Sequence, residues 1–176
     1  MLCYTTVRTS LEYIGGNAHM GKLEIRQPAP DFELPNQDCT LVRLADFRGQ
    51  KLVAYFYPKD NTSGCTREAE GFRDQHDAIV AAGARVVGIS KDSVSSHAKF
   101  HSKLELPFDL LSDTEHSVLE AYGAWGTKTM YGKTSEGTIR STVIVDEEGC
   151  VAAVFAKVKP DGHAQEVLAA LASLSD

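Results

Sequence analysis

The chain has 176 residues, of which 43% are hydrophobic and 24% charged. These proportions are average for a globular domain and argue against a chain that is disordered or fibrous as a whole. A folded chain of this length buries roughly 70% of the surface that its unfolded form exposes, so one domain can hold a core without disulfide or metal staples. The net charge is −6 and the basic residues are scattered, which excludes the basic footprint of a nucleic-acid binder. No run approaches the ~20 apolar residues of a membrane helix, so no membrane partner is expected.

The first 19 residues carry several Ser and Thr but no apolar core of signal-peptide length. We expect residues 1–19 to be an extension that is disordered or absent from the mature protein, with a targeting peptide as the alternative, and residues 20–176 to be the folded domain. The four cysteines are widely spaced and form no C-x-x-C, at positions Cys3, Cys39, Cys65 and Cys150. This spacing matches neither a zinc ribbon nor a disulfide framework. It favours a reducing, cytoplasmic location.

A nearly continuous apolar run, Lys51 to Tyr57, predicts a central strand covered on both faces. After a polar turn, apolar or small residues recur at helical spacing until Gly83, at Cys65, Ala69, Phe72, His76, Ile79 and Val80. Residues 84–90 then read as a second strand and residues 92–104 as a helix. Together these segments predict a βαβ unit with parallel strands and a right-handed crossover.

The second half of the chain predicts an antiparallel hairpin. Ser141–Val145 and Cys150–Ala156 flank the turn DEEG, in which Gly149 can adopt a positive φ. The last helix is expected to start near Asp161 as N-cap and to place four apolar residues on one face: Val167, Leu168, Leu171 and Leu174. The fold class is therefore α/β with a mixed sheet.

The segment most informative about chemistry lies between the central strand and the helix after it. Ligands bind at such strand ends in open α/β sheets, and Cys65 falls in the first turn of the helix, where free N–H groups and the macrodipole favour an anion. An unperturbed thiol, with a pKa of about 8.5, is only a few per cent thiolate at neutral pH, and the helix end supplies only ~0.3–1 kcal/mol. The remaining stabilisation of a reactive thiolate must come from a nearby cation. Arg140, directly before the strand STVIV, is the candidate.

Each of these residues also has a purely structural interpretation. A cysteine is most often a small buried hydrophobe, and that interpretation stands for Cys3, Cys39 and Cys150. The polar, Gly-containing loop before Cys65 predicts partial exposure, which is typical of reactive cysteines. Alternatively, Thr62 caps the helix, Pro58 shapes the loop and Arg140 forms a surface ion pair.

A metal site is not expected. His97 and His101 have the spacing of two zinc ligands on a helix, but Ala98 occupies the place of the Glu in H-E-x-x-H and no third ligand is evident. The two histidines are expected on a solvated helix face.

The run YFYPKDNTSGCTREAEGFRD, Tyr55 to Asp74, resembles the peroxidatic loop of peroxiredoxins, with the pattern P-x-x-x-T-x-x-C as Pro58, Thr62 and Cys65. Three further segments are similar to the bacterioferritin-comigratory, or Q-type, subfamily: PAPDFELPNQD, YGAWGTKTMYGKTSEGTIRSTVIVDEEG and KVKPDGHAQEVL. The resemblance spans about Met20 to Asp176.

This resemblance implies a thioredoxin-like fold, with a central mixed sheet flanked by helices, and a peroxidase that reduces hydrogen peroxide and organic hydroperoxides. Cys65 would be the peroxidatic nucleophile, Thr62 would hold the peroxide, Pro58 would shield the pocket and Arg140 would position peroxide and thiolate. The N–H groups of Gly64 and Cys65 would add donors to the peroxide oxygens. The product is Cys65 sulfenic acid. No cofactor or metal is implied, and the expected assembly is a monomer or weak homodimer.

The sequence departs from the subfamily at two positions. Glu70 stands where many members carry the resolving cysteine, and Ser63 stands where many have proline. We therefore expect a one-cysteine mechanism recycled by an external thiol: thioredoxin, glutaredoxin with glutathione, or a small thiol. Cys3, Cys39 or Cys150 could replace the resolver, although none lies at a recognised resolver position.

Two other functions are compared with this one. The missing resolver favours, as the alternative, a peroxide sensor or redox relay whose lingering sulfenic acid forms mixed disulfides with partner proteins. A disulfide oxidoreductase fits the implied fold but lacks the C-x-x-C that its chemistry uses.

Overall fold

The computed structural model describes residues 23–175. Its centre is a five-stranded sheet of order β5-β4-β3-β8-β9, made of β3 (Lys51–Phe56), β4 (Ala84–Ser90), β5 (Asp109–Ser112), β8 (Ser141–Val145) and β9 (Val151–Phe155). β4 is parallel to β3 and β5, whereas β8 is antiparallel to β3 and β9. The predicted βαβ unit, hairpin and mixed sheet are confirmed. The expected extension at residues 1–19 and the domain start at Met20 lie outside the described residues.

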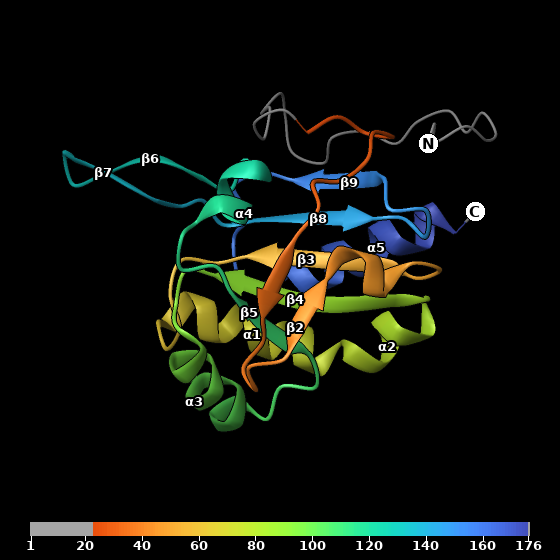
Figure 1. Cartoon of the computed structure of the whole chain (residues 1–176), viewed down its shortest axis with the longest axis horizontal. Helices are drawn as coiled ribbons and strands as arrows, with labels where there is room; N and C mark the ends of the chain where they lie inside the picture. The colour runs from red at the N-terminus through yellow and green to blue at the C-terminus, as the bar shows by residue number, and fades with distance from the viewer. Residues whose placement is uncertain (1–22, 176) are drawn as a thin grey trace.

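Two layers cover the sheet because β3 is apolar on both faces. Val53 and Tyr55 point into one buried cluster, and Leu52, Ala54 and Phe56 into the other. Four helices contribute to the first cluster: α1 (Ser63–Asp74), α2 (His76–Ala81), α3 (Val94–Leu104) and α5 (His163–Leu174). The second face carries β1 (Glu33–Pro35), β2 (Leu41–Arg43), the 3-10 helix η1 (Leu44–Phe47) and α4 (Ser117–Ala121), which lie in front of the sheet in Figure 1.

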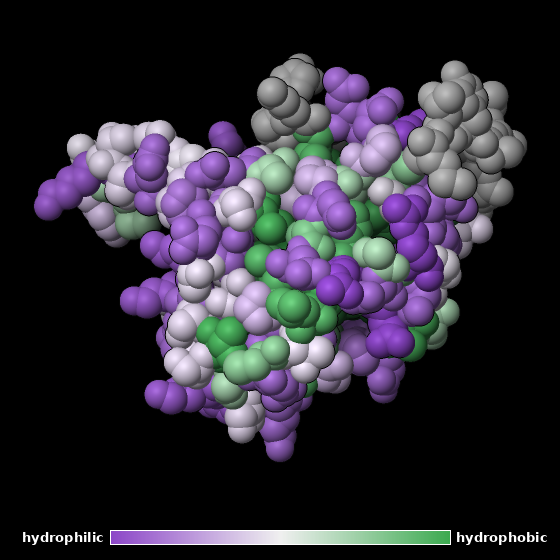
Figure 2. Space-filling view, viewed as in Figure 1, coloured by the Kyte–Doolittle hydropathy of each residue, from purple (hydrophilic) through white to green (hydrophobic). Residues whose placement is uncertain are grey.

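A hairpin that the sequence did not predict, β6 (Trp125–Met130) paired with β7 (Lys133–Thr138), extends away from the sheet (Figure 1). Its tip exposes Tyr131 almost completely, at 98%. On the face seen in Figure 2, hydrophobic side chains gather in the centre over β1 and β2, whereas the hairpin at the left is mainly neutral or hydrophilic.

Three sequence-based element boundaries were wrong. The single helix expected up to Gly83 is divided between α1 and α2 at Gln75, whose φ and ψ are −98° and 4°. Val80 is exposed and is not part of the apolar face.

The helix expected from residue 92 starts at Val94 with Ser93 as N-cap. The last helix starts at His163 with Gly162 at the N-cap, because Asp161 instead pairs with Arg67 at 2.7 Å. Its predicted apolar face is confirmed.

Among residues 23–175, no helix is both long and apolar enough to cross a membrane.

Candidate active site

Cys65 lies at the edge of the sheet where β3 ends and α1 begins. It occupies the third position of α1, whose first turn contains no acidic residue. Thr66 is the first residue of this turn with an intrahelical bond, its N–H donating to the Thr62 carbonyl at 2.9 Å, so the preceding N–H groups are available to an anion. The expected partial exposure was wrong: Cys65 is only 1% exposed, because it packs into the cluster that contains Tyr55 and Phe72.

Arg140 approaches the sulfur from the neighbouring strand. β8 pairs with β3 so that Ser141 lies opposite Phe56, which places Arg140 level with the carboxyl end of β3. Its Nη2 donates to the Cys65 Sγ at 3.3 Å. Burial alone disfavours the charged guanidinium, but Glu68 and Cys65 outweigh it and raise the pKa of Arg140. The guanidinium therefore stays charged beside the sulfur and is not a surface ion pair.

Glu68 is a member of the site that the sequence reasoning missed. Its side chain is fully buried, and its Oε2 accepts a hydrogen bond from Nη1 of Arg140. Burial raises the pKa of Glu68 to about 7, although Arg140 opposes this shift. Its second oxygen, Oε1, has no hydrogen-bond partner. The sequence could have predicted that Glu68 lies beside Cys65, because residues three apart on a helix share a face and Glu68 follows Cys65 at that spacing.

Gly64 lets the guanidinium come this close. A Cβ at this position would lie 3.2 Å from Nη2 of Arg140 and 3.5 Å from Cγ of Pro160. The first of these distances is tighter than ordinary van der Waals contact, so a side chain here would press on the arginine.

Thr62 and Pro58 belong to the loop that covers this edge. Thr62 is at the N-cap position of α1, but its hydroxyl makes no capping bond; it donates instead to the Lys59 carbonyl at 2.9 Å. The alternative interpretation of Thr62 as a side-chain cap is therefore wrong. Pro58 is half-buried and follows Tyr57, the residue after β3.

Asp60 fixes the middle of the same loop to α3. Its carboxylate accepts hydrogen bonds from Tyr57 Oη and Ser96 Oγ, each at 2.7 Å, and lies 2.8 Å from His97 Nδ1. Burial raises the pKa of Asp60, but these three partners outweigh it and hold the pKa below its ordinary value. The expected solvated position of His97 was wrong, since its ring is fully buried. The helical spacing of His97, Phe100 and Leu104 could have predicted this burial, because the three residues share one buried helix face.

Asp60, His97 and Asp92 bring their ligand atoms within 4.8 Å of one another, as a metal site would. Each of these side chains already has hydrogen-bond partners within the protein. His97 Nε2 lies 3.1 Å from the Leu111 carbonyl, and Oδ2 of Asp92 accepts from Ser90 Oγ at 2.6 Å and from the Asp60 N–H at 3.0 Å. The cluster is a hydrogen-bonded anchor of the loop.

The family model described as AhpC/TSA matches residues 25–154. This chain belongs to the AhpC/TSA family. The peroxiredoxin Bcp of Bacillus subtilis is 44% identical over 154 residues, 88% of this chain and 98% of that protein. The Escherichia coli peroxiredoxin Bcp is 43% identical over 149 residues, 85% of this chain and 96% of that protein. The expected membership among the peroxiredoxins of the bacterioferritin-comigratory type is thus confirmed.

Solved structures agree with this family. A structure of the Xanthomonas campestris bacterioferritin comigratory protein, concerned with its alkyl peroxide reduction activity, superposes with a TM-score of 0.81 at 38% identity, and covers 89% of this chain and 99% of that one. The thioredoxin-like fold is therefore confirmed as well, and this member of the AhpC/TSA family is a thiol peroxidase.

The other cysteines within the described residues lie at the far edge of the sheet. Cys39 is exposed in the turn between β1 and β2, so its interpretation as a small buried hydrophobe was wrong. Gln37 in that turn bonds Asp109 and Leu110 at the start of β5. Cys150 directly precedes β9, whose other end, Phe155, pairs with Thr142 beside the Cys65 edge. Five residues of extended strand span about 17 Å, whereas a disulfide needs Cα atoms about 4.4–6.8 Å apart. Cys3 lies outside the described residues.

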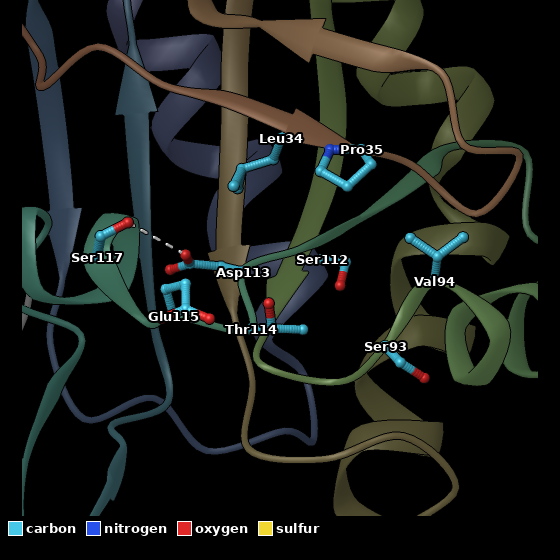
Figure 3. A pocket seen from close by; sticks show the side chains of 9 residues that line it. All are labelled: Leu34, Pro35, Ser93, Val94, Ser112, Asp113, Thr114, Glu115 and Ser117. Carbon is cyan, nitrogen blue, oxygen red and sulfur yellow. Dashed lines mark hydrogen bonds between the residues drawn. The ribbon is translucent and has the colours of Figure 1, made fainter.

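A hollow of about 330 Å³ lies at the ends of β4 and β5 (Figure 3). Its lining comes from β1, the start of α3, and the stretch from the end of β5 to the start of α4: Leu34, Pro35, Ser93, Val94, Ser112, Asp113, Thr114, Glu115 and Ser117. The carboxylate of Asp113 is already used within the fold, since it accepts the Leu119 N–H at 2.8 Å. The lining includes no member of the Cys65 site.

Proposed function

We propose that this thiol peroxidase reduces hydrogen peroxide and organic hydroperoxides at Cys65 by a one-cysteine mechanism. The observation that carries the proposal is the contact between the charged guanidinium of Arg140 and the Cys65 sulfur at the N-terminus of α1. Both features stabilise a thiolate relative to the neutral thiol. Positive charge thus lies beside the sulfur in a site from which bulk water is excluded, since Cys65 is only 1% exposed.

In the proposed reaction, the thiolate attacks the terminal oxygen of the hydroperoxide, so that an S–O bond forms as the O–O bond breaks. The attacked oxygen keeps its hydrogen and becomes the sulfenic acid, and the departing alkoxide or hydroxide takes one proton to leave as alcohol or water. Negative charge moves from sulfur to the departing oxygen. Donors fixed beforehand around that oxygen stabilise the transition state, and we assign this role to Arg140 and to the N–H groups of Gly64 and Cys65.

Thr62 and Pro58 complete the proposed site. Thr62 stands one turn before Cys65 and is exposed, so its hydroxyl can turn from the Lys59 carbonyl to a bound peroxide. Pro58 presents no N–H group and an apolar ring, and we assign it to shielding the thiolate from water. The anchoring of Asp60 to α3 supports both assignments, because it fixes the loop between these two residues.

Recycling by an external thiol is supported by the positions of the described cysteines. Glu70 occupies the position of the usual resolver, and Cys39 and Cys150 lie at the opposite edge of the sheet. An external thiol, supplied by thioredoxin, by glutaredoxin with glutathione, or as a small molecule, would attack the Cys65 sulfenic acid. Such recycling needs a supply of reduced thiol, which a cytoplasmic location would provide. We propose a monomer or weak homodimer as the working assembly.

The test is intact mass spectrometry of the reduced protein after one equivalent of hydrogen peroxide, with a sulfenic-acid trap and peptide mapping. We expect one added oxygen, trapped on Cys65, and loss of peroxide consumption in Cys65→Ser. Cys39→Ser, an exposed thiol at the far edge, serves as the control and should keep wild-type consumption. Loss of two hydrogens with a disulfide on Cys65 would contradict the one-cysteine mechanism. Slow turnover with all thiol donors, together with a trapped partner protein, would favour the peroxide sensor.

A further inference from the structure

Four lysines from three separate segments surround the edge of the sheet at which Cys65 lies. Lys59 belongs to the loop after β3, Lys128 to β6, and Lys157 and Lys159 to the segment between β9 and α5. In Figure 1 these segments meet on the left, where the arrows of β3 and β9 end and the hairpin leaves the sheet.

Contacts tie two of these segments to the site. The carbonyl of Lys59 accepts the Thr62 hydroxyl at 2.9 Å, and its own side chain is exposed. The segment of Lys157 and Lys159 runs beside Arg140, because the Val158 N–H donates to the Arg140 carbonyl at 2.9 Å. Pro160 comes within 3.5 Å of the position that a Gly64 Cβ would take. Both lysines of this segment are exposed.

Lys128 joins them from the hairpin. It is half-buried on β6, and its aliphatic stem lies 4.0 Å from the position of a Cβ on Gly137 across the hairpin. Burial and the charge of Arg140 lower the pKa of Lys128, whereas Cys65 raises it. The hairpin that carries Lys128 ends at Thr138, two residues before Arg140, so its base lies next to the Cys65 site.

Three acidic groups of this edge are already paired with a basic side chain. Glu68 is paired with Arg140 and Asp60 with His97, and Asp161 is paired with Arg67 at 2.7 Å. Glu70, half-buried on α1, Glu136 on β7 and Glu166 on α5 remain as nearby negative charges. The four lysines therefore form a basic rim on a chain whose net charge is −6. A local charge opposite to the overall charge selects and steers ligands of the other sign.

We propose that this basic rim recognises the reductant, and that the reductant is a small thiol carrying at least one carboxylate. The inference deepens the one-cysteine mechanism and rests on it. A small molecule is favoured over a protein thiol because Sγ is recessed, with Cys65 only 1% exposed. The thiolate of the reductant attacks the sulfenic sulfur, an S–S bond forms, and the hydroxyl leaves as water after taking one proton. A second thiolate then displaces Cys65 as thiolate and leaves as the symmetric disulfide.

The experiment uses three small thiols of similar size and different charge: 3-mercaptopropionate, 2-mercaptoethanol and cysteamine. The full chain is first oxidised to the Cys65 sulfenic acid with hydrogen peroxide, and its loss is then followed by stopped flow at equal thiolate concentrations. The same rates are measured for the triple variant Lys59→Gln, Lys128→Gln, Lys159→Gln. The ratio of wild-type to variant rate for each thiol cancels the intrinsic nucleophilicity of that thiol.

We expect the triple variant to slow 3-mercaptopropionate by roughly five- to twentyfold at low salt, 2-mercaptoethanol by less, and cysteamine by about twofold or less. Added 0.5 M NaCl should bring the three ratios together, because the rim is screened. Lys99→Gln, an exposed lysine of α3, is the matched control and should leave all three rates unchanged. Equal ratios for the three thiols at low salt, or an equal effect of Lys99→Gln, would overturn the inference. If no sulfenic acid forms on Cys65, the proposed one-cysteine mechanism itself fails, which is a separate outcome.

Discussion

Cys65 and Glu68, one turn apart on the same face of α1, share the guanidinium of Arg140. Nη2 contacts the sulfur at 3.3 Å, and Nη1 donates to the buried carboxylate. One cation thus contacts both the sulfur and the carboxyl group, so that any change in the charge of Glu68 changes the field at the sulfur. Catalysis and stability are coupled through this arginine, and substitutions can separate them.

Replacing Arg140 by Met should affect stability and activity by different routes. Peroxide reduction should slow by roughly 10²–10³-fold, the usual effect of removing a donor to developing charge. At pH 8 the free energy of unfolding should fall by about 1–2 kcal/mol, because Glu68, whose pKa is about 7 beside Arg140, must then take up a proton or stay buried without its partner. The double variant Glu68→Gln, Arg140→Met should regain most of this stability and none of the activity. Urea denaturation and stopped-flow oxidation measure the two effects, and a double variant that is as unstable as Arg140→Met would contradict the pairing.

The stability of the protein should respond to pH through Glu68. Burial raises the pKa of Glu68 from 4.5 to about 7 in the folded state, so between these values the folded chain binds more protons than the unfolded chain. The stability contributed by this group is then present below pH 4.5, falls as pH rises, and is lost by pH 7, by roughly 3 kcal/mol in total. The measurement is the difference in unfolding free energy between the wild type and Glu68→Gln from pH 4.5 to 8. A difference that does not vary with pH would refute this assignment.

Gly64→Ala should reduce activity without destabilising α1. The new Cβ would lie 3.2 Å from Nη2 of Arg140 and would displace the guanidinium, so we expect peroxide reduction to slow by about tenfold. Gly71→Ala on the same helix is the matched control, because its Cβ would make only an ordinary contact of 3.7 Å with Ala164. That control should raise stability by roughly 0.5–1 kcal/mol and keep wild-type rates. Wild-type rates in Gly64→Ala would show that the close approach of Arg140 is not needed.

His97→Leu tests the anchor of the loop that carries Thr62. Without the imidazole, the carboxylate of Asp60 loses a buried partner at 2.8 Å, and we expect a loss of about 2–4 kcal/mol of stability. Because the loop is released, the KM for hydroperoxide should rise several-fold. A variant that is destabilised but has the wild-type KM would limit His97 to a structural role.

The sequence by itself determined the central strand, the βαβ unit, the β8–β9 hairpin and the position of Cys65 at a helix N-terminus. These features follow from local patterns: a continuous apolar run, a change of period from two to about 3.6, and a polar turn between them. It also identified Arg140 as the cation, since a residue directly before a strand lies at the edge of a sheet.

Only the tertiary structure decided which polar side chains are buried and with which partners. Glu68 and His97 lie on helices that appear amphipathic and solvated in sequence, and they become buried because Arg140 and Asp60, 72 and 37 residues away, complete their hydrogen bonds. The break at Gln75, the start of α5 after Gly162 and the β6–β7 hairpin likewise depend on packing between distant segments. The burial of a charge is favourable only once its partner is in place, and that partner is supplied by the fold, not by the neighbouring sequence.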